Sequence, residues 1–347
     1  MSRRPRQFAS DNYAGICPEA WQALVEANQD HAPSYGQDDW TARAVELIRA
    51  LFETECEVFF VFNGTAANAL ALASLCQPHH RILCHQLAHL EADECGAPEF
   101  FCRGSKLVLL PGPQGKIEPA QIEEAARRRQ DVHHPMARAV SVTQATELGT
   151  LYSEAELQGI GAACRRLGLT LHMDGARFAN ALASTGLAPR RLSWEAGVKV
   201  LSLGGSKNGL GLGEAVVFFD RELALEFDYR RKQAGQLASK MRFLAAPWVG
   251  MLRDGAWLRL AQHANEMAAS LAAQMQTLPG IRVLYPCQAN AVFVDMPPDT
   301  ADALYEKGWM FYPFPGSGGW RFMCAWDTRE EDVVELMESF GAVISDQ

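Results

Sequence analysis

The chain has 347 residues, and its formal net charge is −9. An acidic chain without a basic tract is a poor partner for nucleic acid or for an anionic membrane surface, so we expect neither. At roughly 150 residues per domain the length allows about two domains. A hydrophobic fraction of 48% is enough for a sizeable core.

The cysteines and the N-terminal stretch bear on the compartment. The nine cysteines are scattered, odd in number and never spaced as C-x-x-C, which excludes a regular disulfide framework and a zinc ribbon. The stretch "MSRRPRQFASDNYAG" is basic but lacks the apolar segment of a signal peptide. No apolar run is long enough to span a bilayer. We expect a protein of the reducing cytoplasm.

Short apolar strands alternate with helices through the first two thirds of the chain. In chain order, the patterns predict a helix over 41–54, a strand over 57–62 leading into an alanine-rich helix, a strand over 137–144, a helix over 153–168, and strands over 169–174, 198–204 and 213–219. Ser153 and Glu156 are placed as a capping box. This alternation predicts an α/β fold whose mostly parallel sheet is buried on both faces.

The character of the sequence changes after about residue 250. A long helical pattern over 255–278 precedes three strand-like stretches, and Thr328 with Glu331 is expected to begin a last helix. We therefore predict a large α/β domain over 1–250, including the N-terminal segment, and a small α+β domain over 251–347.

Open α/β sheets bind ligands beyond the carboxyl ends of their strands, so polar residues at these ends are informative. Asn63, Gly64 and Thr65 follow the strand over 57–62 as a helix begins. The free N–H groups of such a turn attract an anion, typically phosphate, and Thr65 adds a hydroxyl. An ordinary helix cap is the alternative interpretation.

Asp174 ends the strand over 169–174, where a buried carboxylate is costly unless it is paired. It either forms an ion pair with Arg177 or holds a protonated heterocyclic nitrogen.

Lys207 is the one cation in "VLSLGGSKNGLGLGEAVVFF", residues 200–219. A partly desolvated lysine becomes a nucleophilic amine and forms imines with carbonyl compounds. The stretch is not a phosphate loop of the Walker type, because Asn208 follows the lysine. The alternative is a surface lysine between two strands.

Taken together, these strand ends provide what pyridoxal phosphate requires. Lys207 would bind the aldehyde, Asp174 would keep the pyridine nitrogen protonated so that the ring accepts electrons, and the turn at 63–65 with Ser206 would hold the phosphate.

The chain resembles the low-specificity L-threonine aldolases and phenylserine aldolases of fold type I. The resemblance covers nearly the whole chain, through "FASDNYAGICPEAW", "YGQDDWTARA", "FNGTAANALALASLC", "AHLEADECGAPEF", "LHMDGARFANA", "GGSKNGLGLGEAVVFF" and "GSGGWRFMCAWDT". It implies a pyridoxal-phosphate-dependent transferase-like fold. It also implies a reversible split of β-hydroxy-α-amino acids into glycine and an aldehyde. A homotetramer, built as a dimer of dimers with shared active sites, is the implied assembly.

The resemblance also implies roles for individual residues. Gly64, Thr65 and Ser206 would hold the phosphate, and His89 would stack on the cofactor ring and help to deprotonate the substrate hydroxyl. Arg177 would contact the phenolic oxygen of the cofactor or the substrate carboxylate, and Ser10 and Arg321 would hold that carboxylate. His133 would lie near the substrate hydroxyl. Tyr35 would reach the site of a neighbouring subunit, and Lys240 or Arg242 would bind the cofactor phosphate of a neighbour.

The sequence departs from the family in one loop, where "TQATELG" replaces an Asn-Thr-His run that many members carry, which bears on the contacts to the hydroxyl. The glycines beside the lysine also differ from those of many members. Both changes indicate a sub-branch.

Three alternatives stay open. His85 and His89, at i and i+4 with acidic residues and Cys95 nearby, would share a helical face as zinc ligands do, although H-E-x-x-H is absent. Such a metallohydrolase would leave Lys207 and Asp174 unexplained. A non-catalytic member of the same fold is the second alternative. The third is β-elimination or transamination, which requires the same lysine and aspartate.

Overall fold

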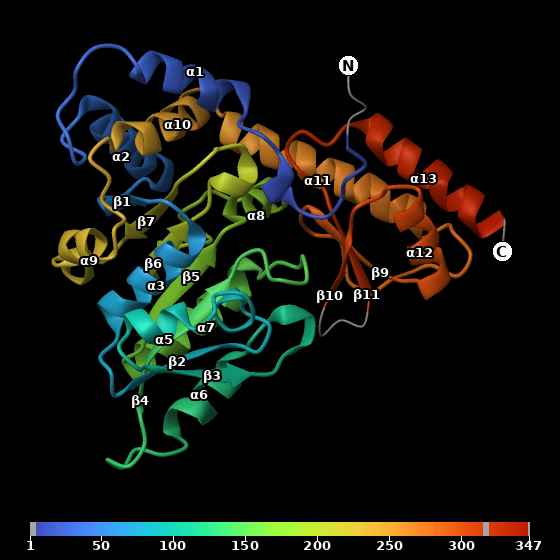
Figure 1. The fold of residues 1–347 in the computed structure, drawn as a ribbon. Helices are drawn as coiled ribbons and strands as arrows, with labels where there is room; N and C mark the ends of the chain where they lie inside the picture. Colours follow the sequence, from blue (N-terminus) through green and yellow to red (C-terminus); the bar gives the residue numbers. More distant parts are fainter. Residues whose placement is uncertain (1–4, 315–318, 346–347) are drawn as a thin grey trace.

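The computed structural model describes residues 5–314 and 319–345, which form one seven-stranded and one four-stranded sheet (Figure 1). The strands are β1 Glu57–Val61, β2 His80–His85, β3 Lys106–Leu110, β4 Met136–Thr143, β5 Thr170–Gly175, β6 Val198–Leu203, β7 Glu214–Phe218, β8 Arg282–Val283, β9 Ala291–Asp295, β10 Tyr312–Phe314 and β11 Gly319–Met323. The helices are α1 Pro18–Ala27, α2 Asp39–Phe52, α3 Gly64–Leu75, α4 His89–Ala92, α5 Ala97–Phe101, α6 Pro119–Arg127, α7 Glu154–Leu167, α8 Phe178–Thr185, α9 Phe227–Gln233, α10 Arg242–Arg253, α11 Ala256–Met275, α12 Pro298–Glu306 and α13 Glu330–Ser345. Five short 3-10 helices join them: η1 Asp11–Tyr13, η2 Pro113–Gly115, η3 Trp194–Ala196, η4 Ser206–Asn208 and η5 Arg221–Ala224.

The large sheet has the order β1-β7-β6-β5-β4-β2-β3. Its β7 is antiparallel to both neighbours, and the other pairings are parallel. The small sheet has the order β10-β11-β9-β8 and is antiparallel throughout. The predicted α/β class, with a large mostly parallel sheet and a smaller second sheet, is confirmed.

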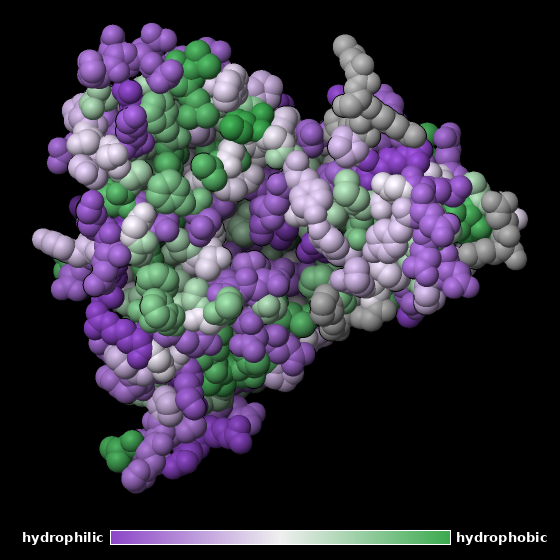
Figure 2. Space-filling model, in the orientation of Figure 1, coloured by the Kyte–Doolittle hydropathy of each residue, from purple (hydrophilic) through white to green (hydrophobic). Residues whose placement is uncertain are grey.

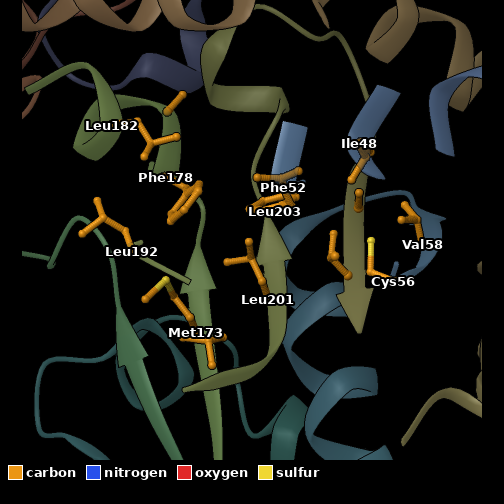
Figure 3. Packing of buried hydrophobic residues seen from close by; sticks show 14 of the residues in the cluster. Ile48, Phe52, Cys56, Val58, Met173, Phe178, Leu182, Leu192, Leu201 and Leu203 are labelled. Carbon is orange, nitrogen blue, oxygen red and sulfur yellow. The ribbon is translucent and has the colours of Figure 1, made fainter. Parts of the chain in front are cut away.

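Side chains of the central strands alternate between two apolar cores. Met173 of β5 and Leu201 of β6 pack with Phe52 and Phe178 on one face, as Figure 3 shows. Val200 of β6 belongs instead to the core that contains the apolar side chains of α3. Because successive residues of a strand point to opposite faces, the residue after Met173 is directed to the α3 side of the sheet.

The small sheet has its own core, and the N-terminal segment is part of it. Phe8 is buried there, its N–H donates to the carbonyl of Met310 at 2.7 Å, and its carbonyl accepts the N–H of Met323 at 2.7 Å. Helix α11 runs from one part of the molecule to the other (Figure 1), with Ala261 in the large core and Ala268 in the small one. The division at residues 250 and 251 stays a prediction.

The two helix starts expected from the sequence, at Ser153 and at Thr328, have different outcomes. Ser153 and Glu156 form a capping box at the start of α7, as predicted. The expected last helix is present as α13, but its start at Thr328 with Glu331 is wrong. The Thr328 hydroxyl accepts the N–H of Ala325 at 2.8 Å, and α13 begins two residues later, at Glu330. The short turn before α13 therefore uses the hydroxyl that the sequence pattern assigned to the helix.

Within residues 5–314 and 319–345, none of the helices combines the length and the apolar character needed to cross a membrane. On the face shown in Figure 2, hydrophilic and hydrophobic side chains are interspersed.

A close helix contact at the start of β6 makes a testable prediction. A Cβ added at Gly161 would lie 1.9 Å from the carbonyl oxygen of Ala196, whereas one added at Gly159 would meet only Pro119, at 3.4 Å. We expect Gly161→Ala to lower the free energy of unfolding by about 1–3 kcal/mol, because the backbone of η3 must move. Gly159→Ala in the same helix should be neutral or stabilising by up to about 1 kcal/mol. Urea denaturation of both variants measures the difference, and equal stabilities would contradict this packing.

Candidate active site

The register of two parallel strands brings the predicted aspartate and lysine to one edge of the sheet. Asp174 is paired with Ser202 and Gly175 with Leu203, so β5 and β6 end together. The N–H of Gly204 then donates to the carbonyl of Gly175 at 3.0 Å, and η4 with Lys207 follows.

The glycines before the lysine are required by close packing. A Cβ at Gly204 would lie 2.2 Å from the carbonyl oxygen of Ala176, and a Cβ at Gly205 would lie 2.4 Å from Leu210. Contacts this short with backbone exclude any larger residue at Gly204. The pair lets the turn that carries Lys207 lie directly against the chain that follows β5.

Lys207 is half-buried, and its amine makes no hydrogen bond or ion pair with the residues that the structure describes. Its charge acts electrostatically on Asp11, His89 and Glu214, which places these three groups near the amine. A half-buried lysine without a partner is available for a covalent bond to a carbonyl compound.

Asp174 is 3% exposed and is held by two hydrogen bonds. Its Oδ1 accepts the N–H of Ala176 at 3.0 Å, and its Oδ2 accepts Nδ2 of Asn68 in α3 at 2.9 Å. The carboxylate is therefore oriented before any ligand arrives. It makes no recorded ion pair with Arg177, so that alternative is wrong.

A hydrogen-bonded chain links this aspartate to His89. Nδ2 of Asn68 also donates to Oε1 of Glu94 at 2.8 Å, and the same oxygen lies 2.8 Å from Nδ1 of His89. The bond to Glu94 raises the pKa of His89 above its ordinary value, and burial raises the pKa of Glu94. An ionised Glu94 can only accept, so Nδ1 is then the donor in this bond and Nε2 is left as the basic atom of the ring.

Two links of this chain were not identified as cofactor-site residues from the sequence. Asn68 lies in the alanine-rich helix without a motif of its own, and Glu94 was noted only as an acidic neighbour of a metal site. A polar residue on an otherwise apolar helix was the available signal for Asn68.

Arg177 is held by a buried aspartate from the N-terminal segment. Its Nε and Nη2 donate to the two oxygens of Asp11 at 2.8 and 3.0 Å, and Nδ2 of Asn290 also donates to Asp11 at 3.0 Å. Burial opposes the ionisation of Asp11, but the charges of Arg177 and Lys207 and these hydrogen bonds outweigh it, so the pKa of Asp11 lies below its ordinary value. Asp11 and Asn290 were also missed in the sequence analysis.

Arg321 of β11 brings a second guanidinium to the same place. Its Nη2 donates to the carbonyl of Ala9 at 3.2 Å, while its Nε is buried without a partner among the described residues. Burial and then the charge of Arg177 lower the pKa of Arg321. Ser10 follows Ala9, is nearly buried, and accepts the N–H of Asn12 at 3.1 Å. Two neighbouring guanidinium groups with a free donor suit a carboxylate.

The turn at the start of α3 is a helix cap that also faces open space. Asn63 accepts the N–H of Ala66 at 2.9 Å, as an ordinary N-cap does. A Cβ added at Gly64 would meet nothing within 4 Å, and Thr65 is only half-buried. The cap therefore leaves the first N–H groups of the helix accessible to an anion.

His133 lies outside this group within one chain. It belongs to the loop before β4, where its N–H donates to Asp131 at 3.0 Å and its side chain lines a surface pocket with His79 and His134. Only the far end of β4, at Thr143, lies beside Asp174. A contact of His133 with the substrate hydroxyl is therefore not formed by a single chain.

Three other predicted residues share a different surface. The N–H of Tyr35 donates to the carbonyl of Ser239, the residue before Lys240, at 3.0 Å. Nη1 of Arg242 donates to the carbonyl of Asp30 at 3.2 Å. No recorded hydrogen bond between described residues joins this surface to Lys207, and the predicted role of Tyr35, Lys240 and Arg242 in a neighbouring subunit stays a prediction.

The helical histidine pair is wrong. His85 ends β2, and His89 opens the four-residue helix α4, so no continuous helix presents both. Both ring nitrogens of His85 are engaged, Nε2 with the carbonyl of Gly112 at 3.1 Å and Nδ1 with the N–H of Leu87 at 3.0 Å. The shared zinc-binding face on which the metallohydrolase alternative depended does not exist.

Known proteins resemble this chain over nearly its whole length. Low specificity L-threonine aldolases of Pseudomonas sp. (strain NCIMB 10558) and Pseudomonas aeruginosa are each 58% identical to it, covering 99% of the chain and 100% and 99% of those proteins. The solved structure of a Leishmania major threonine aldolase has a TM-score of 0.92 and 29% identity, covering 98% of this chain and all of that one. Residues 7–297 match the family described as beta-eliminating lyase. The protein with this lysine and aspartate at adjoining strand ends belongs to the beta-eliminating lyase family.

Proposed function

We propose that this protein is a pyridoxal-phosphate-dependent aldolase. It cleaves β-hydroxy-α-amino acids such as L-threonine, L-allo-threonine and phenylserine reversibly to glycine and an aldehyde. The observation that carries the proposal is the amine of Lys207, which has no partner within residues 5–314 and 319–345, at the sheet edge where the buried Asp174 is already oriented. The names of the two Pseudomonas relatives support the substrate class.

The residues present fit this cofactor. Lys207 offers a free amine to its aldehyde, and Asp174 offers a fixed carboxylate to its ring nitrogen. The start of α3, with open space at Gly64, and the hydroxyls of Thr65 and Ser206 suit its phosphate. When bound, pyridoxal phosphate supplies an electron sink for the bond cleaved at the substrate α-carbon.

The other site residues bind the substrate and move its proton. Arg177 and Arg321, with Ser10 beside them, hold the carboxylate and so fix which bond to the α-carbon faces the ring. His89 accepts the hydroxyl proton at Nε2, because Glu94 holds Nδ1. Loss of that proton lets the β-carbon leave as an aldehyde.

The site is completed in a homo-oligomer, in our proposal a dimer of dimers. Tyr35 and one of Lys240 or Arg242 would then reach a neighbouring subunit's site, which explains why they lie on a separate surface of this chain. His133 does not act within its own chain.

The covalent role of Lys207 is tested first. We expect the purified protein to be yellow, borohydride to bleach the colour, and the pyridoxyl group to be found on a peptide containing Lys207. Lys207→Ala should abolish turnover while the far-UV circular dichroism stays unchanged, because the half-buried lysine makes no hydrogen bond or ion pair with a described residue. Lys199→Ala, on β6 with its amine 3.3 Å from Asp220, is the matched control. A Lys207→Ala protein that still released glycine at the parent rate would reject the assignment.

The products distinguish aldol cleavage from β-elimination and transamination, which would use the same lysine and aspartate. We expect L-threonine to give glycine and acetaldehyde in equal amounts, and phenylserine to give glycine and benzaldehyde. A 2-oxo acid with ammonia would instead indicate β-elimination, and a 2-oxo acid formed only with an amino acceptor would indicate transamination.

Asp174→Asn keeps an oxygen acceptor for Asn68 but removes the charge that stabilises a protonated ring nitrogen. We expect kcat to fall by about 100-fold or more, in the range found when one electrostatic group is removed from a reacting centre. The visible band should persist, because the lysine is unchanged. Measured kcat near that of the parent would be incompatible with this role.

The pH dependence tests the pair of Glu94 and His89. A general base must be neutral, so kcat/KM should rise as pH increases through the pKa of His89, which the bond to Glu94 raises. Glu94→Gln removes that charge, lowers the pKa of His89 and should move the acid limb of the profile to lower pH, with a reduced maximum. Glu91→Gln is the control, because Glu91 is exposed and lies on α4 with His89. An acid limb that does not move in Glu94→Gln would exclude His89 as the base held by Glu94.

A further inference from the structure

A buried glutamate lies between the two segments that we assign to the cofactor phosphate. Glu214 is 7% exposed, opens β7 and is paired with Val61 near the end of β1. Strand β1 leads into the start of α3, and β6 leads into η4 with Ser206. Glu214 is thus a carboxyl group at the junction of both segments, and the reaction proposed above does not use it.

Its carboxyl group is bonded to the turn before the lysine. Oε2 accepts the N–H of Gly205 at 2.5 Å, and the carboxyl also interacts with the N–H and the hydroxyl of Ser206. The Ser206 hydroxyl has one proton, and its other recorded acceptor, the carbonyl of Gly213, is 3.5 Å away. An ionised Glu214 therefore competes with a phosphate for that proton.

The elements packed against Glu214 bring mainly uncharged groups to it. Lys207, on η4, is the charged group among the main causes that act on its pKa, which it lowers. From β1 it is faced by Val61, the turn into α3 consists of the uncharged residues 63–65, and from α10 Leu244 lies beside the adjacent Gly213. Burial raises the pKa of Glu214 to about 7, so a modest change in its surroundings alters its protonation.

We propose that Glu214 takes up a proton when the cofactor phosphate binds, donates it in a hydrogen bond to Oγ of Ser206, and so frees the Ser206 hydroxyl to donate to the phosphate. The proton comes from solvent, and no covalent bond other than O–H is formed or broken. A dianionic phosphate beside an ionised, buried carboxylate would otherwise be repelled, which is why the two events are coupled. This inference rests on the phosphate site proposed above.

The test compares pyridoxal phosphate with pyridoxal, which lacks the phosphate, on the full-length protein freed of cofactor. Dissociation constants are measured by absorbance between pH 6.5 and 8.5 for the parent and for Glu214→Gln, which keeps an acceptor for Gly205. Glu57→Gln, at the opposite end of the β1 and β7 pairing, is the matched control.

For the parent, we expect the preference for pyridoxal phosphate over pyridoxal to weaken above pH 7, by up to about tenfold per pH unit if one proton is taken up. The phosphate contributes little to this trend, because its second pKa is about 6. In Glu214→Gln the preference should stay nearly constant, and at pH 8.5 it should exceed that of the parent severalfold. Affinity for pyridoxal should be the same in both proteins, and Glu57→Gln should behave as the parent does.

The outcomes separate this inference from the proposals beneath it. If the parent binds both compounds equally, the phosphate site itself is wrong. If it prefers pyridoxal phosphate but Glu214→Gln shows the same pH trend, only the role of Glu214 is rejected. If Glu214→Gln weakens the binding of both compounds equally at every pH, the glutamate merely supports the turn.

Calorimetry of the unmodified protein at pH 8, in buffers of different ionisation enthalpy, adds a check without a variant. More protons must be taken up with pyridoxal phosphate than with pyridoxal.

Discussion

The close parallel approach of β5 and β6 is the constraint on which the rest of the site depends. It requires glycine at 204, because any Cβ there would overlap the carbonyl oxygen of Ala176. With that contact made, Asp174 and the turn that carries Lys207 stand at one edge of a sheet that has an apolar core on each face. The positions of the carboxylate and the amine are then set by the backbone and not by flexible side chains, which favours a preorganised reaction centre.

Four of the described carboxyl groups of the site are buried, and each is stabilised differently. Asp11 is ionised against Arg177, Asp174 accepts two hydrogen bonds from neutral groups, and Glu94 is bonded to His89 and Asn68. Glu214 has mainly backbone N–H groups and a hydroxyl, which is why burial dominates its pKa. In our proposal, these differences let one small site hold a fixed counter-charge, a base and a carboxyl group that takes up a proton.

Periodicity and turn chemistry predicted β1, β4, β5, β6 and β7 of the large sheet, whose apolar patterns are regular, but not β2 and β3. Short segments were less predictable. The histidines of the region from His85 to Cys95 have helical spacing, yet His85 is the last residue of β2. Its backbone pairs with Leu110 of β3 and therefore cannot join a helix with His89. Thr328 had the spacing of a capping residue, but the chain turns before α13, and the Thr328 hydroxyl accepts the N–H of Ala325 in that turn. In both places, long-range pairing or a tight turn overrides the local pattern.

The sequence by itself determined the α/β class, the lysine and aspartate at strand ends and, through its resemblance to a family, the expected chemistry. These features are local or repeat along the chain, so they can be recognised without coordinates. Only the tertiary structure decided that Asp11 is the partner of Arg177, that Asn68 and Glu94 connect Asp174 to His89, and that Glu214 lies under Ser206. Those contacts join residues far apart in the chain, and whether a buried polar group finds a partner depends on how the elements pack.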